Sequence, residues 1–394
     1  MSATTIHCNQ SQPALYMAME LSSKNWVIAF STGVARDPRL REVAARDLPE
    51  LQREIRAARE KFGLPDDVPV VSCYEAGRDG FWLHRCLVHN GVQNVIVDSA
   101  SIERNGRRKH VKTDRIDARR LVTMLCRFHG GERDVFRTVC VPSDGDEDRR
   151  HLHRELKTLK GDRTRLTNRI RALLAELGLN SVVRLDRKFP QWLKGVLLWN
   201  GQPVPEGARA RLLRQFQRLQ RYEEEIAELE KQRRERIRHE DSPQAEKVRT
   251  LLGLKAIGET SAWLLVSEVF GWRTFRGKRQ LASFTGLVNA PYNTGESERD
   301  QGITKAGNKW IRAVIIEIAW IWLRYQPQSA LSRWYRQRFG GPGKRMKKVG
   351  IVALARKLII ALWRYLEQGI PPEGAILVPW YEKTGLSKAP ALAC

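Results

Sequence analysis

Residues 112–121 read Lys112-Thr113-Asp114-Arg115-Ile116-Asp117-Ala118-Arg119-Arg120-Leu121, and the rest of the chain is best interpreted from this stretch. Two carboxylates three positions apart, Asp114 and Asp117, share one face of a predicted helix. Carboxylates bind hard divalent cations, and the neighbouring arginines can hold a phosphodiester backbone. An isolated pair of this kind is more often a solvated helix with ion pairs. A metal site therefore depends on acids elsewhere in the chain.

The overall charge points to a polyanionic partner. The 394 residues contain 69 Lys and Arg against 44 Asp and Glu, which gives a net charge of +25. Such an excess favours nucleic acid as the partner. The most apolar stretch, residues 311–325, is interrupted by Arg312, Glu317 and Arg324, and the N-terminus has no signal-peptide pattern. We therefore expect a soluble cytoplasmic protein with no membrane contact.

The cysteines and histidines do not suggest a metal or disulfide framework. None of the six cysteines forms a C-x-x-C pair. His84, Cys86 and His89 lie close together in a predicted amphipathic helix, but their spacing fits no usual zinc pattern. We expect these three residues to have core or surface roles.

The N-terminal part alternates between strand and helix patterns. Apolar runs predict a strand hairpin and two further strands, and amphipathic stretches between them predict helices. This order is typical of an α/β domain. The predicted strands cover residues 15–22, 26–30, 68–75 and 92–98, and the predicted helices cover residues 48–62 and 81–89.

Two further acids fall on these predicted strands. Glu20 lies within the first apolar strand, and Glu75 ends a later one. Together with Asp114 and Asp117 they form the acid set from which a ribonuclease-H-like fold builds a two-metal site for phosphodiester attack. Each acid alone is more often structural, and Asp98 or Glu103 could replace one of the four.

Two long helices are predicted next, over residues 151–179 and 208–239, separated by a segment rich in proline and glycine. Their apolar stripes indicate an antiparallel or intermolecular coiled coil. A helical spacer and a dimerisation arm that also touches nucleic acid are equally compatible with this pattern.

The C-terminal part combines turns with basic residues. Residues 251–265 resemble a helix-hairpin-helix turn, although a plain helical hairpin would look similar. A polar loop over residues 289–301 precedes a glycine-containing turn and a helix. Ten Lys or Arg and no Asp or Glu occur from Arg333 to Arg364. The residues that we expect to contact nucleic acid are Arg107, Arg108, Lys109, Lys112, Arg115, Lys305, Lys309, Arg312, Lys344, Arg345, Lys347 and Lys348.

Four strings in this order resemble the insertion-sequence transposases that have an Asp-Glu-Asp-Asp acid set and use a bridge RNA. They are Tyr74-Glu75-Ala76-Gly77, residues 112–118, Phe284-Thr285-Gly286-Leu287 and residues 302–308, which read G-I-T-K-A-G-N. The resemblance covers nearly the whole length. It implies a RuvC-like domain, a coiled-coil connection and a C-terminal transposase domain. It also implies Mg²⁺-dependent cutting and rejoining of donor and target DNA chosen by pairing with an RNA.

The resemblance assigns the four acids to Glu20, Glu75, Asp114 and Asp117, which would hold two Mg²⁺ ions. Glu20 stands where the family usually has Asp. The family also uses a serine, in the loop before G-I-[ST]-K, that attacks a phosphodiester. Thr294 matches that position here, and Ser297 and, by a register slip, Asn293 are alternatives, whereas Tyr292 has a hydroxyl but does not match by position.

Three functions remain open from the sequence: the RNA-guided recombinase, a metal-dependent junction endonuclease without a covalent intermediate, and an inactive nucleic-acid-binding relic. A recombinase that joins two DNAs should be a homodimer or a dimer of dimers. We expect a RuvC-like domain over residues 13–150, a coiled-coil and dimerisation region over 151–240, a mostly helical C-terminal transposase domain over 245–375 and a tail over 376–394.

Overall fold

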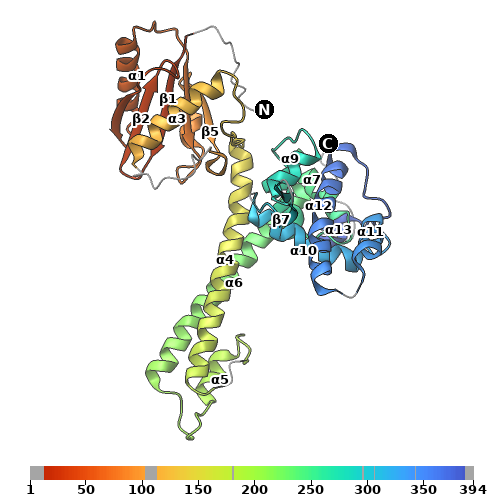
Figure 1. The fold of residues 1–394 in the computed structure, drawn as a ribbon. Coiled ribbons are helices and arrows are strands. Elements are labelled where there is room, and N and C mark those ends of the chain that lie inside the picture. The colour runs from red at the N-terminus through yellow and green to blue at the C-terminus, as the bar shows by residue number, and fades with distance from the viewer. Residues whose placement is uncertain are drawn as a thin grey trace. The chain divides into compact units, whose positions relative to one another are not determined.

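The chain folds into two compact units, Met1–Val141 and Pro142–Cys394 (Figure 1). The computed structural model describes residues 13–102, 113–179, 182–294, 297–305, 307–341 and 343–386. For residues 291–301 this description covers at most the backbone.

A five-stranded mixed sheet, in the order β3-β2-β1-β4-β5, forms the centre of the first unit. The strands β1, β2 and β3 pair antiparallel, whereas β4 and β5 continue the sheet parallel to β1. This sheet confirms the predicted α/β region and is consistent with a ribonuclease-H-like fold. The strands are β1 (Leu15–Leu21), β2 (Asn25–Ser31), β3 (Arg39–Ala44), β4 (Val70–Glu75) and β5 (Gln93–Val97).

Helices cover both faces of this sheet. Side chains alternate along a strand, so Met17 and Met19 face α1 (Leu48–Phe62) and α2 (Trp82–His89). Ala18 and its neighbours face α3 (Asp114–His129), which packs on the opposite side. Each face has its own apolar core, and α3 packs on the face that carries the candidate acids, together with Val135 and Phe136.

The local patterns located most of these elements to within two residues. The strand β3 was not predicted, because in Arg39–Ala44 only Val43 is buried and the rest is charged or partly exposed. Its position at the edge of the sheet explains this composition, since one side of an edge strand packs against little.

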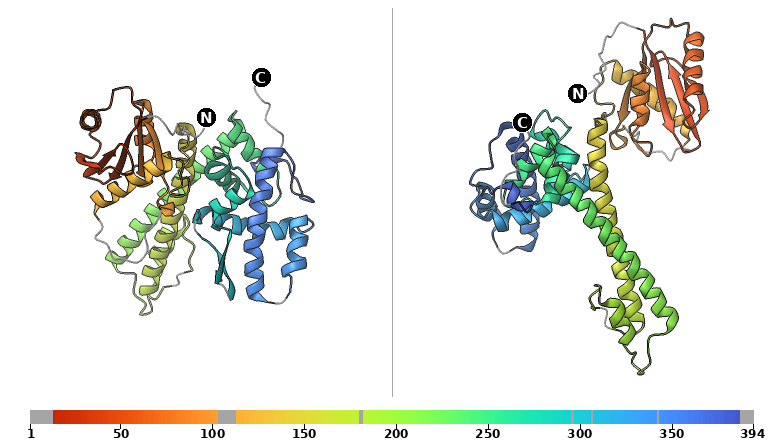
Figure 2. Two further views of the ribbon diagram at one scale, coloured as in Figure 1. Left: turned by 45° about the horizontal axis from the view of Figure 1, so that its top comes forward. Right: turned by 180° about the vertical axis from the view of Figure 1, so that it is seen from behind.

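In the second unit, α4 (Asp144–Glu176) and α6 (Glu206–His239) pack against each other (Figure 2). Lys160 Nζ lies 2.5 Å from Glu230 Oε1, and Arg149 Nη2 lies 2.6 Å from Glu240 Oε1, so the two helices are antiparallel. The helix α4 begins before the predicted residue 151, because Ser143 accepts a hydrogen bond from the Asp146 amide and caps an earlier start. The segment between them carries α5 (Phe189–Gly195).

The remainder of the second unit is mostly helical, as expected, and it packs around one apolar core that includes Trp322 and Leu358. In the described part of the chain, none of the helices combines the length and apolar character that a bilayer crossing needs. Its elements are α7 (Pro243–Leu252), α8 (Glu259–Leu265), the π-helical turn η2 (Val266–Phe270), α9 (Lys278–Thr285), β6 (Asn289–Thr294), β7 (Ser297–Ile303), α10 (Lys309–Tyr325), α11 (Ala330–Phe339), α12 (Lys344–Gln368) and α13 (Trp380–Lys383).

A buried ion cluster joins α4 to this helical core. Glu268 is 2% exposed and accepts hydrogen bonds from Arg150 Nε at 3.2 Å and Arg154 Nε at 3.0 Å. Removing Glu268 would leave arginine charge without its partner at a largely buried position, which is costly. The cluster therefore anchors the base of the helical hairpin formed by α4 and α6.

The C-terminal segment holds the turn between α7 and α8. The Val378 amide donates to the Gly253 carbonyl at 2.8 Å. The Lys383 ammonium donates to three carbonyls, those of Leu252 and Leu254 at 2.6 Å and that of Ile257 at 2.9 Å. The α7–α8 turn, predicted as a helix-hairpin-helix, is thus closed by residues far away in the sequence.

Candidate active site

Glu20 on β1 and Glu75 at the end of β4 occupy neighbouring strand positions. Met19 lies opposite Tyr74 in the parallel pairing of these strands, so the next residue of each strand is one of the two glutamates. Alternation places both on the side of Ala18 and Cys73, the side that α3 covers. Both glutamates are half-buried. The sheet therefore presents two carboxylates next to each other under the helix.

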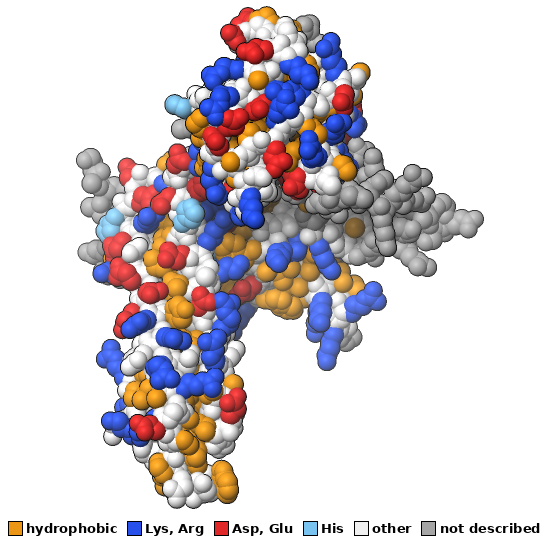
Figure 3. Space-filling view, turned by 90° about the vertical axis from the view of Figure 1, so that its left-hand side faces the viewer, with side chains coloured by type: hydrophobic (Ala, Val, Ile, Leu, Met, Phe, Trp, Pro, Cys, Tyr) orange, Lys and Arg blue, Asp and Glu red, His pale blue; other side chains and the backbone are white. Residues whose placement is uncertain are grey.

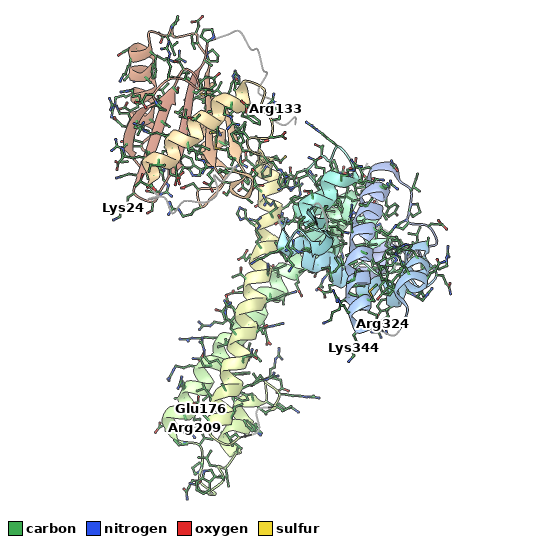
Figure 4. All side chains as sticks on the ribbon, viewed as in Figure 1. Lys24, Arg133, Glu176, Arg209, Arg324 and Lys344 are labelled. Carbon is green, nitrogen blue, oxygen red and sulfur yellow. The ribbon has the colours of Figure 1, made fainter. Side chains whose placement is uncertain are left out.

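The helix α3 runs antiparallel to β1. Tyr16 Oη, near the start of β1, lies 2.9 Å from His129 Nδ1 at the end of α3. Figure 4 places Lys24, in the turn after β1, and Arg133, beyond α3, at opposite ends of the unit. Asp117 lies about 18 Å along α3 from His129, and Glu20 about 13 Å along β1 from Tyr16, in the same direction. The first turn of α3 therefore belongs to the end of the sheet that carries Glu20.

Asp114 and Asp117 occupy that first turn. The Thr113 hydroxyl accepts a hydrogen bond from the Ile116 amide and starts the helix there. Asp114 is separated by four and seven residues from Ala118 and Leu121, which are buried against the sheet, so it shares their side of the helix. Asp114 is exposed and Asp117 half-buried. The structure thus brings all four predicted acids to one end and one face of this unit.

The donor set fits a hard divalent cation in its chemistry, since it contains only carboxylate oxygens. Among the residues that the structure describes, no three His, Cys, Asp or Glu side chains lie close enough together to hold one metal ion. The four acids are gathered in one region of the first unit without forming a closed ligand set.

Of the two alternative acids, the structure describes Asp98. Asp98 caps the short helix η1 (Ser99–Ser101), where its Oδ1 accepts from the Ala100 amide at 3.1 Å. Glu103 lies outside the described residues, as do the predicted contacts Arg107, Arg108, Lys109 and Lys112. Arg115, in the first turn of α3, is exposed.

The predicted polar loop over residues 289–301 is instead an antiparallel hairpin of β6 and β7, which corrects that prediction. Thr294 pairs with Ser297 at its closed end. Tyr292 and Asn293 are also on β6, and the side chains of all four candidate nucleophile positions lie outside the description. Polar residues that pair across a short turn lack the apolar alternation by which strands are recognised, so the pattern predicted a loop.

Two of the quoted strings meet at a close backbone contact beside this hairpin. A Cβ on Gly307 would lie 2.3 Å from the Gly286 nitrogen and 2.3 Å from the Phe284 carbonyl oxygen. The Asn308 amide donates to the same Phe284 carbonyl at 2.8 Å. Gly286 and Gly307 are thus required by packing at this contact.

The predicted basic contacts around this point differ in role. Arg312 Nη1 donates to the carbonyls of Thr285 at 3.2 Å and Lys305 at 3.3 Å, so its guanidinium holds the same two segments together. Lys305 and Lys309 are exposed. These two lysines therefore present their charges at the surface, whereas Arg312 has a structural role.

The start of α12 is a strongly cationic surface. All its residues before Gly350 are exposed, including Lys344, Arg345, Lys347 and Lys348. Arg324, at the end of α10, and Lys344 are labelled at the same edge of the helical part of the second unit, away from the α4–α6 hairpin (Figure 4). A helix end exposed on every side and carrying this charge is suited to a nucleic-acid backbone.

Sequence reasoning missed the contacts made by side chains far apart in the chain. Lys383 and Glu268 belong to no motif, and nothing in the local sequence distinguishes them from ordinary surface residues. The contact of Gly286 with Gly307 was within reach, since both glycines stand in strings that had been singled out.

Comparison with known sequences establishes the class of protein. Residues 30–178 match a family model described as "Transposase", and residues 248–334 match one described as "Transposase IS116/IS110/IS902 family". "Putative transposase y4rJ" of Sinorhizobium fredii is 36% identical over 380 residues, covering 92% of this chain and 94% of that protein. "Probable family 20 transposase" of Pseudomonas aeruginosa is 31% identical, covering 66% of this chain and 74% of its own length. The class is a DNA transposase.

Within that class, the chain belongs to the IS116/IS110/IS902 family of insertion-sequence transposases. The transposase for insertion sequence element IS1328 of Yersinia enterocolitica is a more distant relative, 26% identical over 55% of this chain and 62% of its own length. DNA is therefore the substrate class that follows from the family.

Proposed function

We propose that this transposase is a Mg²⁺-dependent recombinase that cuts and rejoins donor and target DNA selected by a bridge RNA. The observation that carries the proposal is the placement of Asp114 and Asp117 at the end of the sheet that carries Glu20 and Glu75. Four carboxylates on three elements, sharing one face, are the ligand chemistry of phosphodiester-cleaving metal sites.

In this proposal Glu20, Glu75, Asp114 and Asp117 hold two Mg²⁺ ions. Bound Mg²⁺ supplies charge neutralisation at a phosphodiester oxygen. The glutamates start from fixed backbone positions, because both strands lie inside the sheet, with β1 between β2 and β4 and β4 between β1 and β5. The two aspartates are carried by a helix whose opposite end is tied to β1 through Tyr16 and His129. In this proposal the sheet and the helix would hold the carboxylates near their places before an ion binds.

The attacking group in this proposal is the Thr294 hydroxyl, with Ser297 as the alternative. Attack on phosphorus forms one bond from the threonine oxygen and breaks one to a DNA oxygen. The hydroxyl proton leaves to a base, and the displaced oxygen takes up a proton. One phosphodiester replaces another, so the bond is conserved for rejoining. Thr294 lies on β6 at the closed end of the β6–β7 hairpin, where its backbone pairs with that of Ser297.

The proposed partners follow from the same function. Donor and target DNA and the bridge RNA would meet the basic residues Arg107, Arg108, Lys109, Lys112, Arg115, Lys305, Lys309, Lys344, Arg345, Lys347 and Lys348. Joining two DNAs requires a homodimer or a dimer of dimers, and the α4–α6 pair, as a coiled coil, would provide the dimer contact. Such work on DNA would place the protein in the cytoplasm. We keep the domain division at residues 13–150, 151–240, 245–375 and 376–394 as part of this proposal.

A covalent-capture assay tests the proposal. Purified protein, its RNA, Mg²⁺ and labelled donor and target DNA are incubated, denatured and separated, and any protein–DNA adduct is mapped by peptide mass. We expect an RNA-dependent and Mg²⁺-dependent adduct on Thr294. An adduct on Ser297 would retain the mechanism and move the attacking group. Cut DNA without an adduct would replace the recombinase by a junction endonuclease, and neither product would leave an inactive nucleic-acid-binding relic.

A further inference from the structure

A tryptophan side chain is almost fully exposed to solvent at the end of the helical hairpin formed by α4 and α6. Trp199 is 89% exposed. Glu176 and Arg209, labelled in Figure 4, mark the last turn of α4 and the first turns of α6, which the connecting segment joins. Among the described residues of this hairpin, every exposed large apolar side chain falls in that connection: Val182, Leu197 and Trp199.

The backbone that carries Trp199 is fixed. The Gly201 amide donates to the Leu198 carbonyl at 2.9 Å, and the Leu198 amide donates to the Gln202 carbonyl at 2.8 Å. Gly201 has φ of 75°, which a glycine adopts readily, and Leu197 pairs with Pro203. Leu198 packs into the apolar core of the hairpin end, so the next side chain, Trp199, is directed away from it. The turn therefore holds an indole outward without strain.

Exposed apolar residues are common, but a fixed indole on a cationic segment is not explained by folding. Residues 182–211 contain six Lys or Arg and two Asp or Glu. Figure 3 shows hydrophobic side chains at the free end of the hairpin with Lys and Arg side chains on its flanks. An exposed aromatic ring among cationic side chains suits a nucleic acid, because the cations can bind its phosphates and the ring can stack on a base. Bases of a duplex interior are already stacked, whereas unpaired bases are free to stack.

We infer that the Leu198–Gly201 turn is a stacking site for an unpaired base of single-stranded nucleic acid, with Trp199 as the platform and cationic residues of the same segment, such as Lys194 and Arg209, holding the backbone. The inference rests on the proposed function only in so far as that function requires nucleic-acid binding. In this inference the end of the hairpin binds single-stranded nucleic acid and does not bind a second copy of the chain.

Binding of the full chain to a labelled single strand of about 20 nucleotides, and to the matching duplex, tests the inference in EDTA, where no cutting occurs. Trp199→Ala should weaken single-strand binding about tenfold, with the slope against salt concentration unchanged because no phosphate contact is removed. Duplex binding should stay constant. Trp199→Phe should keep most of the affinity because it retains an aromatic face. Trp320→Ala, which removes a half-exposed tryptophan on α10, is the matched control and should change nothing.

Equal single-strand affinities of wild type and Trp199→Ala would overturn the inference and leave the recombinase intact. A change in sedimentation from dimer to monomer in Trp199→Ala, with unchanged single-strand affinity, would likewise overturn it and assign the turn to a second copy. Failure of the wild type to bind either nucleic acid would overturn both the inference and the proposed function. Cross-linking of a 5-iodouracil-containing strand to the peptide that contains Trp199 would support the inference independently of affinity.

Discussion

Thr294 and Ser297 are cross-strand partners at the closed end of the β6–β7 hairpin, one on each strand. The two hydroxyl residues considered for phosphodiester attack therefore occupy the same end of one small element. Because the two residues are adjacent, a substitution of Thr294 or of Ser297 could disturb the same turn and lower activity indirectly. Mapping the protein–DNA adduct by peptide mass therefore identifies the attacking residue more directly than loss of activity does.

We predict that Thr294→Val abolishes the covalent adduct and lowers recombination by roughly 10³-fold or more, because the side chain keeps its shape and loses its hydroxyl. Thr294→Ser should retain the adduct on residue 294. Ser297→Ala serves as the control for disturbance of the hairpin and should form the adduct at near wild-type level. An adduct that persists in Thr294→Val and vanishes in Ser297→Ala would transfer the role to Ser297.

Asp114→Asn should abolish cleavage and weaken binding of Mn²⁺, used as a spectroscopic substitute for Mg²⁺, while folding and nucleic-acid binding remain. The change removes one negative charge and keeps the volume of the side chain. Asp144→Asn is a matched control, because Asp144 begins α4 as Asp114 begins α3. Both variants lose the same favourable interaction with a helix N-terminus. Equal Mn²⁺ binding in the two would refute the assignment of Asp114 as a ligand.

His153 should make the second unit less stable in acid. His153 is 4% exposed, and its ring stacks on that of Trp310 with 4.6 Å between the centroids. Burial, with help from Arg233, Lys157 and other cations, lowers its pKa from 6.5 to about 3. The unfolded chain therefore takes up a proton first as pH falls, and stability that is present above pH 6.5 is lost between that pH and about 3.

For this one group the loss amounts to about 2 kcal/mol in the free energy of unfolding between pH 7.5 and pH 5. His153→Phe keeps an aromatic ring against Trp310 and should remove that share of the pH dependence. Denaturant unfolding of both proteins at the two pH values measures it, and the other histidines cancel in the difference. Identical pH dependence in the two proteins would contradict the buried neutral state of His153.

Gly307→Ala should destabilise the second unit by about 2 kcal/mol or more, because the new methyl group meets backbone atoms that cannot move independently. Gly207→Ala is the control. Gly207 lies in the first turn of α6 with no atom within 4 Å of an added Cβ, so this change should be neutral or slightly stabilising. Thermal unfolding of the two variants separates the contact with Gly286 from the general effect of replacing glycine.

Local patterns predicted much of the first unit. The apolar runs at β1, β2, β4 and β5 and the amphipathic stretch at α1 were recognisable because burial there follows a simple period along the chain. Three of the four candidate acids stood out for the same reason: Glu20 interrupts an apolar strand, and Asp114 and Asp117 share a helix face. The edge strand β3 and the polar β6–β7 hairpin have no such period, and local reasoning did not find them.

The sequence alone was sufficient to predict the net charge, which follows from composition. It also predicted the α/β character of the first unit and the long helices, because these depend on residues close together in the chain. The contacts between distant segments, by contrast, are decided only in the tertiary structure. Strand register places Glu20 next to Glu75. Packing between segments decides the antiparallel direction of α3 over β1, the contact of Gly286 with Gly307 and the hydrogen bonds of Lys383. Register and packing are decided by which apolar faces are buried together, and a single sequence read locally does not contain that choice.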